Sequence, residues 1–236
     1  MEQDERSTEP AIAVIADLVG GAAQAATGGP WLDELGEVLN EHFTARGTLI
    51  ADFARTRGTA LEGLISLASD PFDAYLFGSL GYRAGNVVMP TRWAIVAGAV
   101  RPGSGPADRR DGMAIRQAQD LSPALRTRGD YALVLRSGAP QPDANLERLT
   151  PWITEGIADL TDNQRSLLAH RMRAGDTTLT LERMRQGARV DVSLEAVRKT
   201  LASTKVRRFD DLIAVARAEF ARGIGDEAPG LRAQGR

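Results

Sequence analysis

The pattern of apolar and polar positions divides the chain into two parts. Over the first 135 residues, short apolar runs that predict strands alternate with stretches of helical periodicity. The strand runs are rich in small and branched apolar residues, and they lie at residues 11–16, 48–53, 61–67, 93–100 and 131–135. The run 61–67 also fits the start of a helix. Helices are predicted at 30–45, 70–84 and 111–121, with Asp70 as the N-cap of the second.

Only helical periodicity follows from residue 146 onwards. The last helices are predicted at residues 160–174, 180–186, 193–203 and 209–222. The proline-rich segment 138–145 is interpreted as a linker. We therefore expect four segments, namely a flexible tail 1–10, an α/β domain 11–138, a helical domain 139–222 and a flexible tail 223–236. The fold class is α/β, a ferredoxin-like sheet with helices on one face, followed by an all-α domain.

Composition removes several classes of site. The 236 residues include no cysteine and two histidines, so disulfides, thiolate nucleophiles, cysteine-ligated metals and multi-histidine metal sites are excluded. No apolar run reaches the ~18 residues that a membrane span needs. The first residues, MEQDER, are acidic and polar rather than signal-like. We expect a cytoplasmic protein with no membrane partner.

Charge is distributed unevenly along the chain. Residues 1–150 carry a net charge of −5, whereas residues 151–236 carry a net charge of +3. Eleven basic residues stand against four acidic ones between positions 165 and 208. Such an asymmetry suggests two domains with different partners, the second of them a polyanion. A solvated helical surface that is merely rich in arginine is the alternative.

Four segments of the first part share their order and spacing with one family. They are residues 12–20 (IAVIADLVG), 57–64 (RGTALEGL), 94–100 (AIVAGAV) and 111–114 (DGMA). Together they resemble the SatD family of bacterial proteins. That resemblance implies a layout similar to class III nucleotidyl cyclases and GGDEF-type domains. In those enzymes, two acidic residues from adjacent strand ends hold magnesium, which requires oxygen ligands.

The resemblance also implies that this chain has lost the enzymatic chemistry. Asp17 occupies the first acidic position, at the end of the first strand. At the second position the family pattern has Gly-Asp-Glu, but this chain has Gly58, Thr59 and Ala60. Asp17 and Thr59 are thus the candidates for a residual ligand site, and no metal, cofactor or catalytic residue is expected. Alternatively, Asp17 is only a polar residue that terminates a buried strand.

Other candidate chemistry is scarce. Neither His42 nor His170 lies near a recognisable serine nucleophile, so both are interpreted as surface or hydrogen-bonded side chains. Trp93 and Trp152 are interpreted as core residues rather than ligand-stacking ones. Glu62 stands where the SatD pattern has glutamine, and we assign it no role beyond a polar face.

Residues 160–217 resemble the helix-turn-helix domains of the LuxR and sigma-factor class. The segment 192–201 (VSLEAVRKTL) would be the recognition helix, with one apolar side and short polar or basic residues elsewhere. Glu195, Arg198 and Lys199 would then enter the major groove. The groups expected at DNA phosphates are the start of that helix at Ser193, together with Arg189, Lys205, Arg207 and Arg208.

The preceding helix departs from the family pattern. It should contain a small residue where the two helices cross, followed by a short turn. If Met184 aligns with the small residue, the turn is longer than usual, and if Gly187 does, the apolar neighbour becomes Gln186. Both alignments leave the crossing of the two helices open.

These observations lead to one functional expectation and two alternatives. We expect a DNA-binding transcriptional regulator, not an enzyme, that binds double-stranded DNA. Its cyclase-like domain would serve dimerisation or ligand sensing, and the chain would form a homodimer. One alternative is a nucleotide-binding sensor without turnover. The other is an adaptor that binds protein partners.

Overall fold

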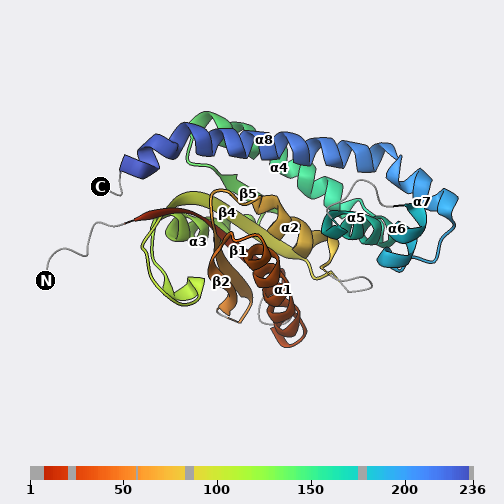
Figure 1. Ribbon diagram of the computed structural model, residues 1–236, viewed down its shortest axis with the longest axis horizontal. Coiled ribbons are helices and arrows are strands. Elements are labelled where there is room, and N and C mark those ends of the chain that lie inside the picture. Colours follow the sequence, from red (N-terminus) through yellow and green to blue (C-terminus); the bar gives the residue numbers. More distant parts are fainter. Residues whose placement is uncertain (1–7, 21–24, 57, 83–87, 175–179, 234–236) are drawn as a thin grey trace, which may run out of the picture.

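The structure is a computed structural model that describes residues 8–20, 25–56, 58–82, 88–174 and 180–233 (Figure 1). Its strands are β1 (Glu9–Leu18), β2 (Leu49–Thr56), β3 (Ala60–Ile65), β4 (Thr91–Val100) and β5 (Leu133–Arg136). The α-helices are α1 (Ala25–Ala45), α2 (Pro71–Leu80), α3 (Met113–Leu125), α4 (Pro140–Ala158), α5 (Asp162–Ala174), α6 (Leu181–Ala188), α7 (Leu194–Leu201) and α8 (Thr204–Ala233). A 3-10 turn, η2 (Ala107–Arg109), precedes α3.

The five strands form one mixed sheet in the order β2-β3-β1-β4-β5. All neighbouring strands are antiparallel except β4 and β5, which are parallel and joined through α3. The elements from β1 to β4 follow the order β-α-β-β-α-β of a ferredoxin-like unit, to which β5 is added. All five predicted strands are present, and residues 60–65 form a strand rather than a helix.

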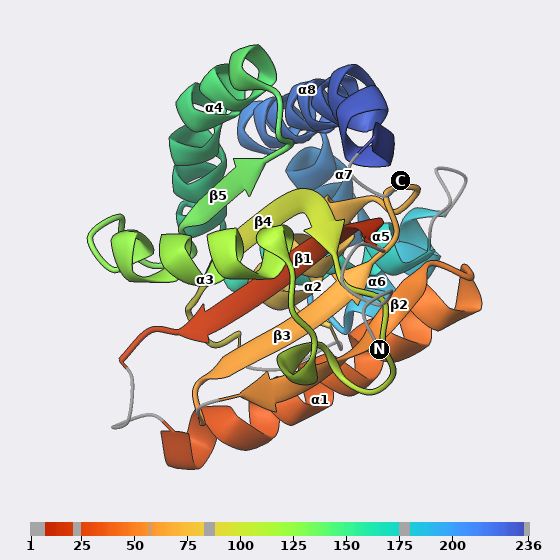
Figure 2. The same ribbon diagram turned by 90° about the vertical axis from the view of Figure 1, so that its left-hand side faces the viewer.

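Helices cover both faces of the sheet, which corrects the expectation of helices on one face. Ile12, Val14 and Ala16 on β1 join the larger apolar cluster together with α1 and α2. Ala13 and Ile15 alternate with them and join a second cluster with α3. Figure 2 shows α3 on the opposite side of the sheet from α2. Both faces are therefore buried.

The segment predicted to be a linker is the start of a helix. Pro140 is the first residue of α4, and the Asp143 carboxylate accepts hydrogen bonds from the Ser137 backbone N–H at 2.6 Å and its hydroxyl at 2.7 Å. α4 and α8 run side by side along the sheet (Figure 1). Leu146 on α4 and Phe209 on α8 belong to the same apolar cluster as Leu133 on β5. The boundary drawn at residue 138 thus lies inside one continuous hydrophobic core.

Both chain ends differ from the predicted tails where they are described. β1 includes Glu9 and Pro10, and residues 1–7 lie outside the described part. α8 continues to Ala233, so the tail predicted from residue 223 is wrong, while 234–236 lie outside the described part. Gly223 is buried in α8, where a Cβ would overlap the Ser137 hydroxyl. Within the described ranges, the helices are too short or too polar to cross a bilayer.

Local sequence explains where several helices begin. The Asp70 side chain accepts the Phe72 backbone N–H at 3.0 Å, which confirms its predicted role as N-cap of α2. α2 ends at Leu80, and residues 83 and 84 of the predicted helix lie outside the described part. α1 begins at Ala25, five residues before the predicted start at Pro30, and includes Gly28 and Gly29, where a Cβ would overlap the side chains of Leu18 and Arg55.

Candidate functional site

Three helices in the C-terminal part pack around one small apolar cluster. Its fully buried members come from α5, α6, the following turn and α7, and they are Leu167, Met184, Ala188, Val190 and Val197. Val197 is the only buried residue of α7 in the described structure. The helix is therefore held by one narrow side, and its remaining sides face solvent.

The close contact between α5 and α6 is made at Gly187. A Cβ on Gly187 would overlap the imidazole of His170, so α6 can approach α5 this closely only with glycine there. Met184, the other residue proposed for the crossing, is instead buried in the apolar cluster. Burial lowers the pKa of His170, and the charge of Arg173 lowers it further.

The turn between α6 and α7 spans residues 189–193. Arg189 ends α6 in the left-handed conformation, with φ of 53° and ψ of 38°, a position that glycine usually occupies. Its backbone N–H donates to the carbonyls of Arg185 and Gln186. Ser193 is the N-cap of α7, and its hydroxyl accepts the Ala196 backbone N–H at 3.2 Å. The predicted phosphate-binding role of Ser193 thus coincides with a capping role.

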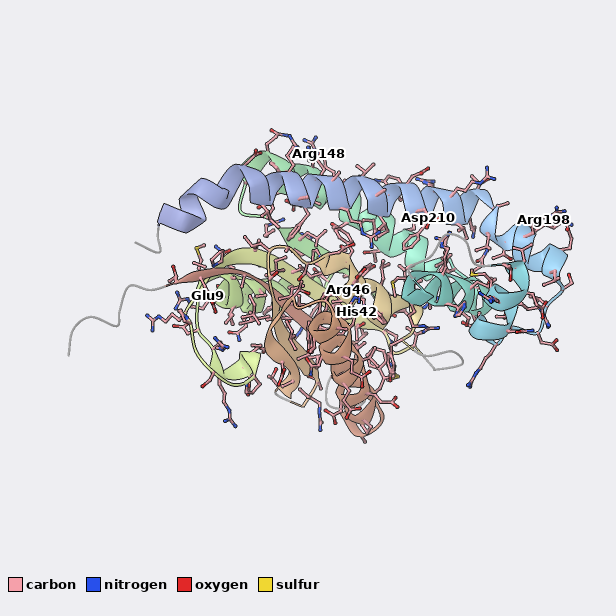
Figure 3. The ribbon with its side chains drawn as sticks, in the orientation of Figure 1. Glu9, His42, Arg46, Arg148, Arg198 and Asp210 are labelled. Carbon is pink, nitrogen blue, oxygen red and sulfur yellow. The ribbon has the colours of Figure 1, made fainter. Side chains whose placement is uncertain are left out.

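Three predicted groove residues lie on the exposed surface of α7. Arg198 and Glu195 form an ion pair at 2.6 Å, although their side chains are 66% and 53% exposed. Lys199 is exposed and forms no ion pair with other described residues. Figure 3 shows Arg198 at one end of the molecule, pointing away from the body. α7 therefore offers a guanidinium, a carboxylate and a free ammonium group on its solvent side.

The predicted basic residues at the start of α8 divide into paired and unpaired ones. Lys205 forms an ion pair with Asp159 at 3.6 Å. The Arg208 guanidinium lies over the Trp152 ring, 5.3 Å from its centre. Arg207 is exposed and, among the described residues, has no ion-pair partner. Trp152 is 51% exposed, so the expectation that it is a core residue is wrong, whereas Trp93 is fully buried.

Asp17 and Thr59 meet at the opposite side of the sheet from α1. The Thr59 hydroxyl donates a hydrogen bond of 3.3 Å to the Asp17 carboxylate. Burial raises the pKa of Asp17, and this effect is opposed by the Thr59 hydrogen bond and by the charges of Arg126 and Arg92. A hydroxyl, and not a second carboxylate, is thus the group that Thr59 presents to Asp17.

Asp17 lines a cavity of about 270 Å³ beneath α3. Its polar lining also includes Gln119 from α3 and Glu62, to which no role beyond a polar face was assigned from the sequence. Glu62 is only 4% exposed and accepts hydrogen bonds from the Thr56 hydroxyl at 2.9 Å and from the Gln119 amide at 3.2 Å. Among the described residues, no group of three acidic or histidine side chains could hold a metal ion.

The strand register explains why Glu62 was missed. Asp17 faces Ala60 across the β1–β3 pair, and Ile15 faces Glu62. Residues two positions apart on a strand share a face, so Asp17 and Glu62 both point toward α3. Glu62 is the one polar side chain in β3, which is the only local signal, because the pairing partner of a strand is a long-range property. The two carboxylates thus share one cavity although 45 positions separate them in the sequence.

Comparisons with known proteins yield one distant similarity. The crystal structure of the guanylyl cyclase Cya2 is similar to this chain with a TM-score of 0.27 and 16% sequence identity. The matched region covers 50% of this chain and 72% of that one. A scan of the chain against protein-family models finds no match, and a search of the curated proteins finds none either.

Proposed function

We propose that this protein is a DNA-binding transcriptional regulator that reads the major groove with α7. The carrying observation is the geometry of α7, which packs on α5 and α6 along one side, through the buried Val197 and the partly buried Leu201. Its other sides present Glu195, Arg198 and Lys199 to solvent. A helix held along one side and polar on the others is what major-groove recognition by a helix-turn-helix requires.

The ion pair on α7 suits base recognition. An arginine side chain can donate two hydrogen bonds to guanine, and a glutamate can accept one from cytosine. The ion pair with Glu195 at 2.6 Å already restricts the Arg198 side chain in the free protein. Arg198 therefore loses less conformational entropy when it binds DNA. Glu195 and Arg198 are therefore our candidates for direct base contacts.

Backbone contacts would come from residues around α7. Arg189, Lys199 and Arg207 are exposed and free of ion pairs among the described residues, so they can approach phosphates without breaking a contact. Lys199 was expected from the sequence to enter the groove, and we now assign it to the backbone because a lone ammonium group binds phosphate as a point charge. Lys205 would contribute after its ion pair with Asp159 breaks. Arg208, also expected from the sequence at a phosphate, lies over the Trp152 ring and is not counted among these contacts. Three new phosphate contacts predict a loss of affinity of about 40-fold between 50 and 200 mM salt.

The α/β part is proposed to be a catalytically inactive, cyclase-like domain of the SatD type. Thr59 replaces a carboxylate next to Asp17, which removes charge that a divalent ion would need. Nucleotide sensing is the weaker alternative, since the cavity at Asp17 holds two carboxylates against Arg126 and would repel a triphosphate. We place the protein in the cytoplasm, where its DNA partner is accessible.

A gel-shift assay against genomic fragments tests the proposal. We expect a shifted complex with the full chain that weakens steeply between about 50 and 200 mM salt. Lys199→Glu should lower affinity by about tenfold or more, because it replaces a phosphate contact with a repulsion. Arg109→Glu is the matched control, since Arg109 is an exposed cation of the α/β part and the change in net charge is identical.

Three outcomes would contradict the proposal or favour one of its alternatives. Equal effects of Lys199→Glu and Arg109→Glu would show that binding depends on net charge and not on α7. No complex with any fragment at low salt would favour the protein-adaptor alternative. A nucleoside triphosphate that raises Tm in the presence of Mg²⁺ would favour the sensor alternative.

A further inference from the structure

α8 carries a second regular side that is exposed along its length. One side of the helix is buried, at Val206, Phe209, Ile213, Ala216 and Phe220. The opposite side is exposed and carries Arg208, Asp211, Val215, Ala218, Arg222 and Gly225. Those six residues alternate in spacing between three and four positions, which places them along one side of the helix, with the apolar Val215 and Ala218 at its middle. Figure 1 shows α8 along the outer edge of the molecule, with the sheet on its inner side.

We infer that this outer side of α8 docks a second copy of this chain, with the two α8 helices antiparallel. A two-fold axis between Val215 and Ala218 places each of these residues opposite the other on the second copy. Val215 is 50% exposed, one of four large hydrophobic side chains exposed in the described structure, and would form the centre of the contact. Because the axis relates identical surfaces, every contact in this arrangement occurs twice.

Charge complementarity supports this register. The same axis places Asp211 of each copy opposite the partner's Arg222, so that two opposite-charge contacts flank the apolar centre. Asp211 forms no ion pair with other described residues, whereas Arg222 pairs with Glu219 on its own helix. In a parallel arrangement Asp211 would face Asp211 and Arg222 would face Arg222. The two charges therefore favour the antiparallel orientation.

Gly225 provides an independent indication. Glycine is unfavourable in a helix interior compared with alanine. A Cβ at Gly225 would meet nothing within 4 Å, so no intramolecular contact requires glycine there, in contrast to Gly223. In the antiparallel pair Gly225 lies opposite the partner's Arg208. The Arg208 guanidinium rests on the Trp152 ring at 5.3 Å, and this bulky stack needs room opposite it.

Sedimentation velocity of the full chain tests the inference, and it does not depend on whether the chain binds DNA. Over about 1 to 500 µM we expect the mass to rise from 25.3 kDa toward twice that value. Asp211→Arg and Arg222→Asp should each weaken association by about tenfold, since each creates two like-charge contacts. The double variant should restore it to about the wild-type level. Glu37→Arg, an exposed reversal on α1, is the control that should change nothing.

Gly225→Gln separates association from folding. The substitution should leave the melting temperature of the dilute protein equal or higher, because the position is open and glutamine favours helix. It should also weaken association by about fivefold or more, because the side chain fills the space opposite Arg208. A wild-type chain that stays monomeric throughout overturns the inference. So does a double charge variant that associates less well than either single one.

Discussion

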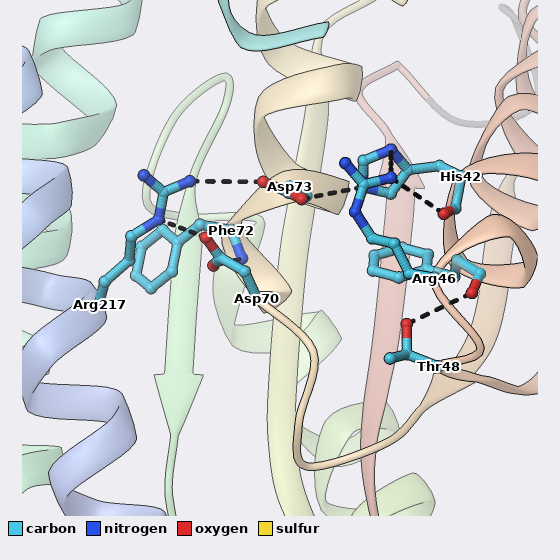
Figure 4. Close-up of polar contacts among 8 residues, drawn as sticks. His42, Arg46, Thr48, Asp70, Phe72, Asp73 and Arg217 are labelled. Carbon is cyan, nitrogen blue, oxygen red and sulfur yellow. Dashed lines mark hydrogen bonds and ion pairs between the residues drawn. The ribbon is translucent and has the colours of Figure 1, made fainter. Parts of the chain in front are cut away.

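The Asp73 carboxylate accepts a hydrogen bond from His42 Nε2 at 2.8 Å (Figure 4). Its other oxygen lies 3.4 Å from Nη2 of Arg217. Arg46 donates to Nδ1 of His42 at 3.0 Å, and since a guanidinium only donates, Nδ1 accepts and Nε2 carries the hydrogen. Asp73 lies in the first turn of α2, His42 on α1 and Arg217 on α8. One carboxylate thus joins the α/β layer to the last helix.

Replacing Asp73 is expected to destabilise the fold. Asp73→Ala leaves the Nε2 hydrogen of His42 without its acceptor, in a place where the Asp73 side chain is only 18% exposed. It also removes one of the two carboxylate partners of Arg217, which keeps its ion pair with Asp70. We expect a loss of about 1.5–3 kcal/mol in the free energy of unfolding, measured by urea denaturation. Asp33→Ala is the control, because Asp33 pairs with Arg55 at the same 2.8 Å but is 48% exposed. Asp33→Ala should lower the free energy of unfolding by at most about 1 kcal/mol. An equal loss for both variants would show that the contacts of Asp73 with His42 and Arg217 do not stabilise the fold.

A methyl group on Gly187 should disturb the contact between α5 and α6. Gly187→Ala gains about 1 kcal/mol of helix propensity but overlaps the His170 ring, at a cost of about 1–3 kcal/mol. We expect a net loss of about 1 kcal/mol, measured by thermal unfolding. In a His170→Ala background the same substitution should become neutral or stabilising. If the background makes no difference, His170 is not the obstacle.

Arg189 is expected to reduce stability through its backbone. The left-handed conformation costs an L-residue roughly 1–2 kcal/mol, partly offset for glycine by its greater unfolded-state entropy. Arg189→Gly should therefore raise the free energy of unfolding by about 0.5–1 kcal/mol, measured by urea denaturation. Arg183→Gly makes the same chemical change at an ordinary helical position of α6 and should lower it. If both substitutions change the free energy of unfolding in the same direction, the left-handed conformation of Arg189 does not reduce stability.

Asp17 should make stability depend on pH with a defined sign. Burial raises its pKa in the folded protein above the ordinary value of 3.8, so the folded state binds the proton more tightly. The stability that this proton contributes is complete below that ordinary value and is lost as pH rises through the folded pKa. Asp17→Asn has no carboxyl group to ionise, so it lacks this pH-dependent loss of stability. Its advantage over the wild type should grow between about pH 3.5 and pH 7 in urea denaturation, and a constant difference would contradict the expectation.

Local sequence signals predicted most of the helices and strands. They failed where contacts with distant segments determine which structure a segment adopts. Asp70 was recognisable as an N-cap because the residue types of capping are local. Proline at residue 140 has two local meanings, a linker or the first residue of a helix, and the contacts of Asp143 with Ser137 select the second. Glycines near residue 225 suggested a tail, yet burial of Phe220 and Gly223 carries α8 onward.

In the candidate sites, too, local features could be predicted from the sequence and features that depend on packing could not. The exposed residues of α7 could be identified because its apolar spacing fixes which side is buried. The sequence left open whether Met184 or Gly187 lies at the helix crossing, because only the position of His170 decides it. Glu62 could not be associated with Asp17, since their proximity depends on strand pairing and not on spacing.

The core shared by β5, α4 and α8 has a consequence for how the molecule denatures. Phe209 and Ile213 cover apolar side chains that a fragment ending at residue 138 would expose to water. Such a fragment should aggregate instead of folding alone. Heat should then melt the sheet together with these long helices in one cooperative transition, despite the change in charge and element type partway along the chain.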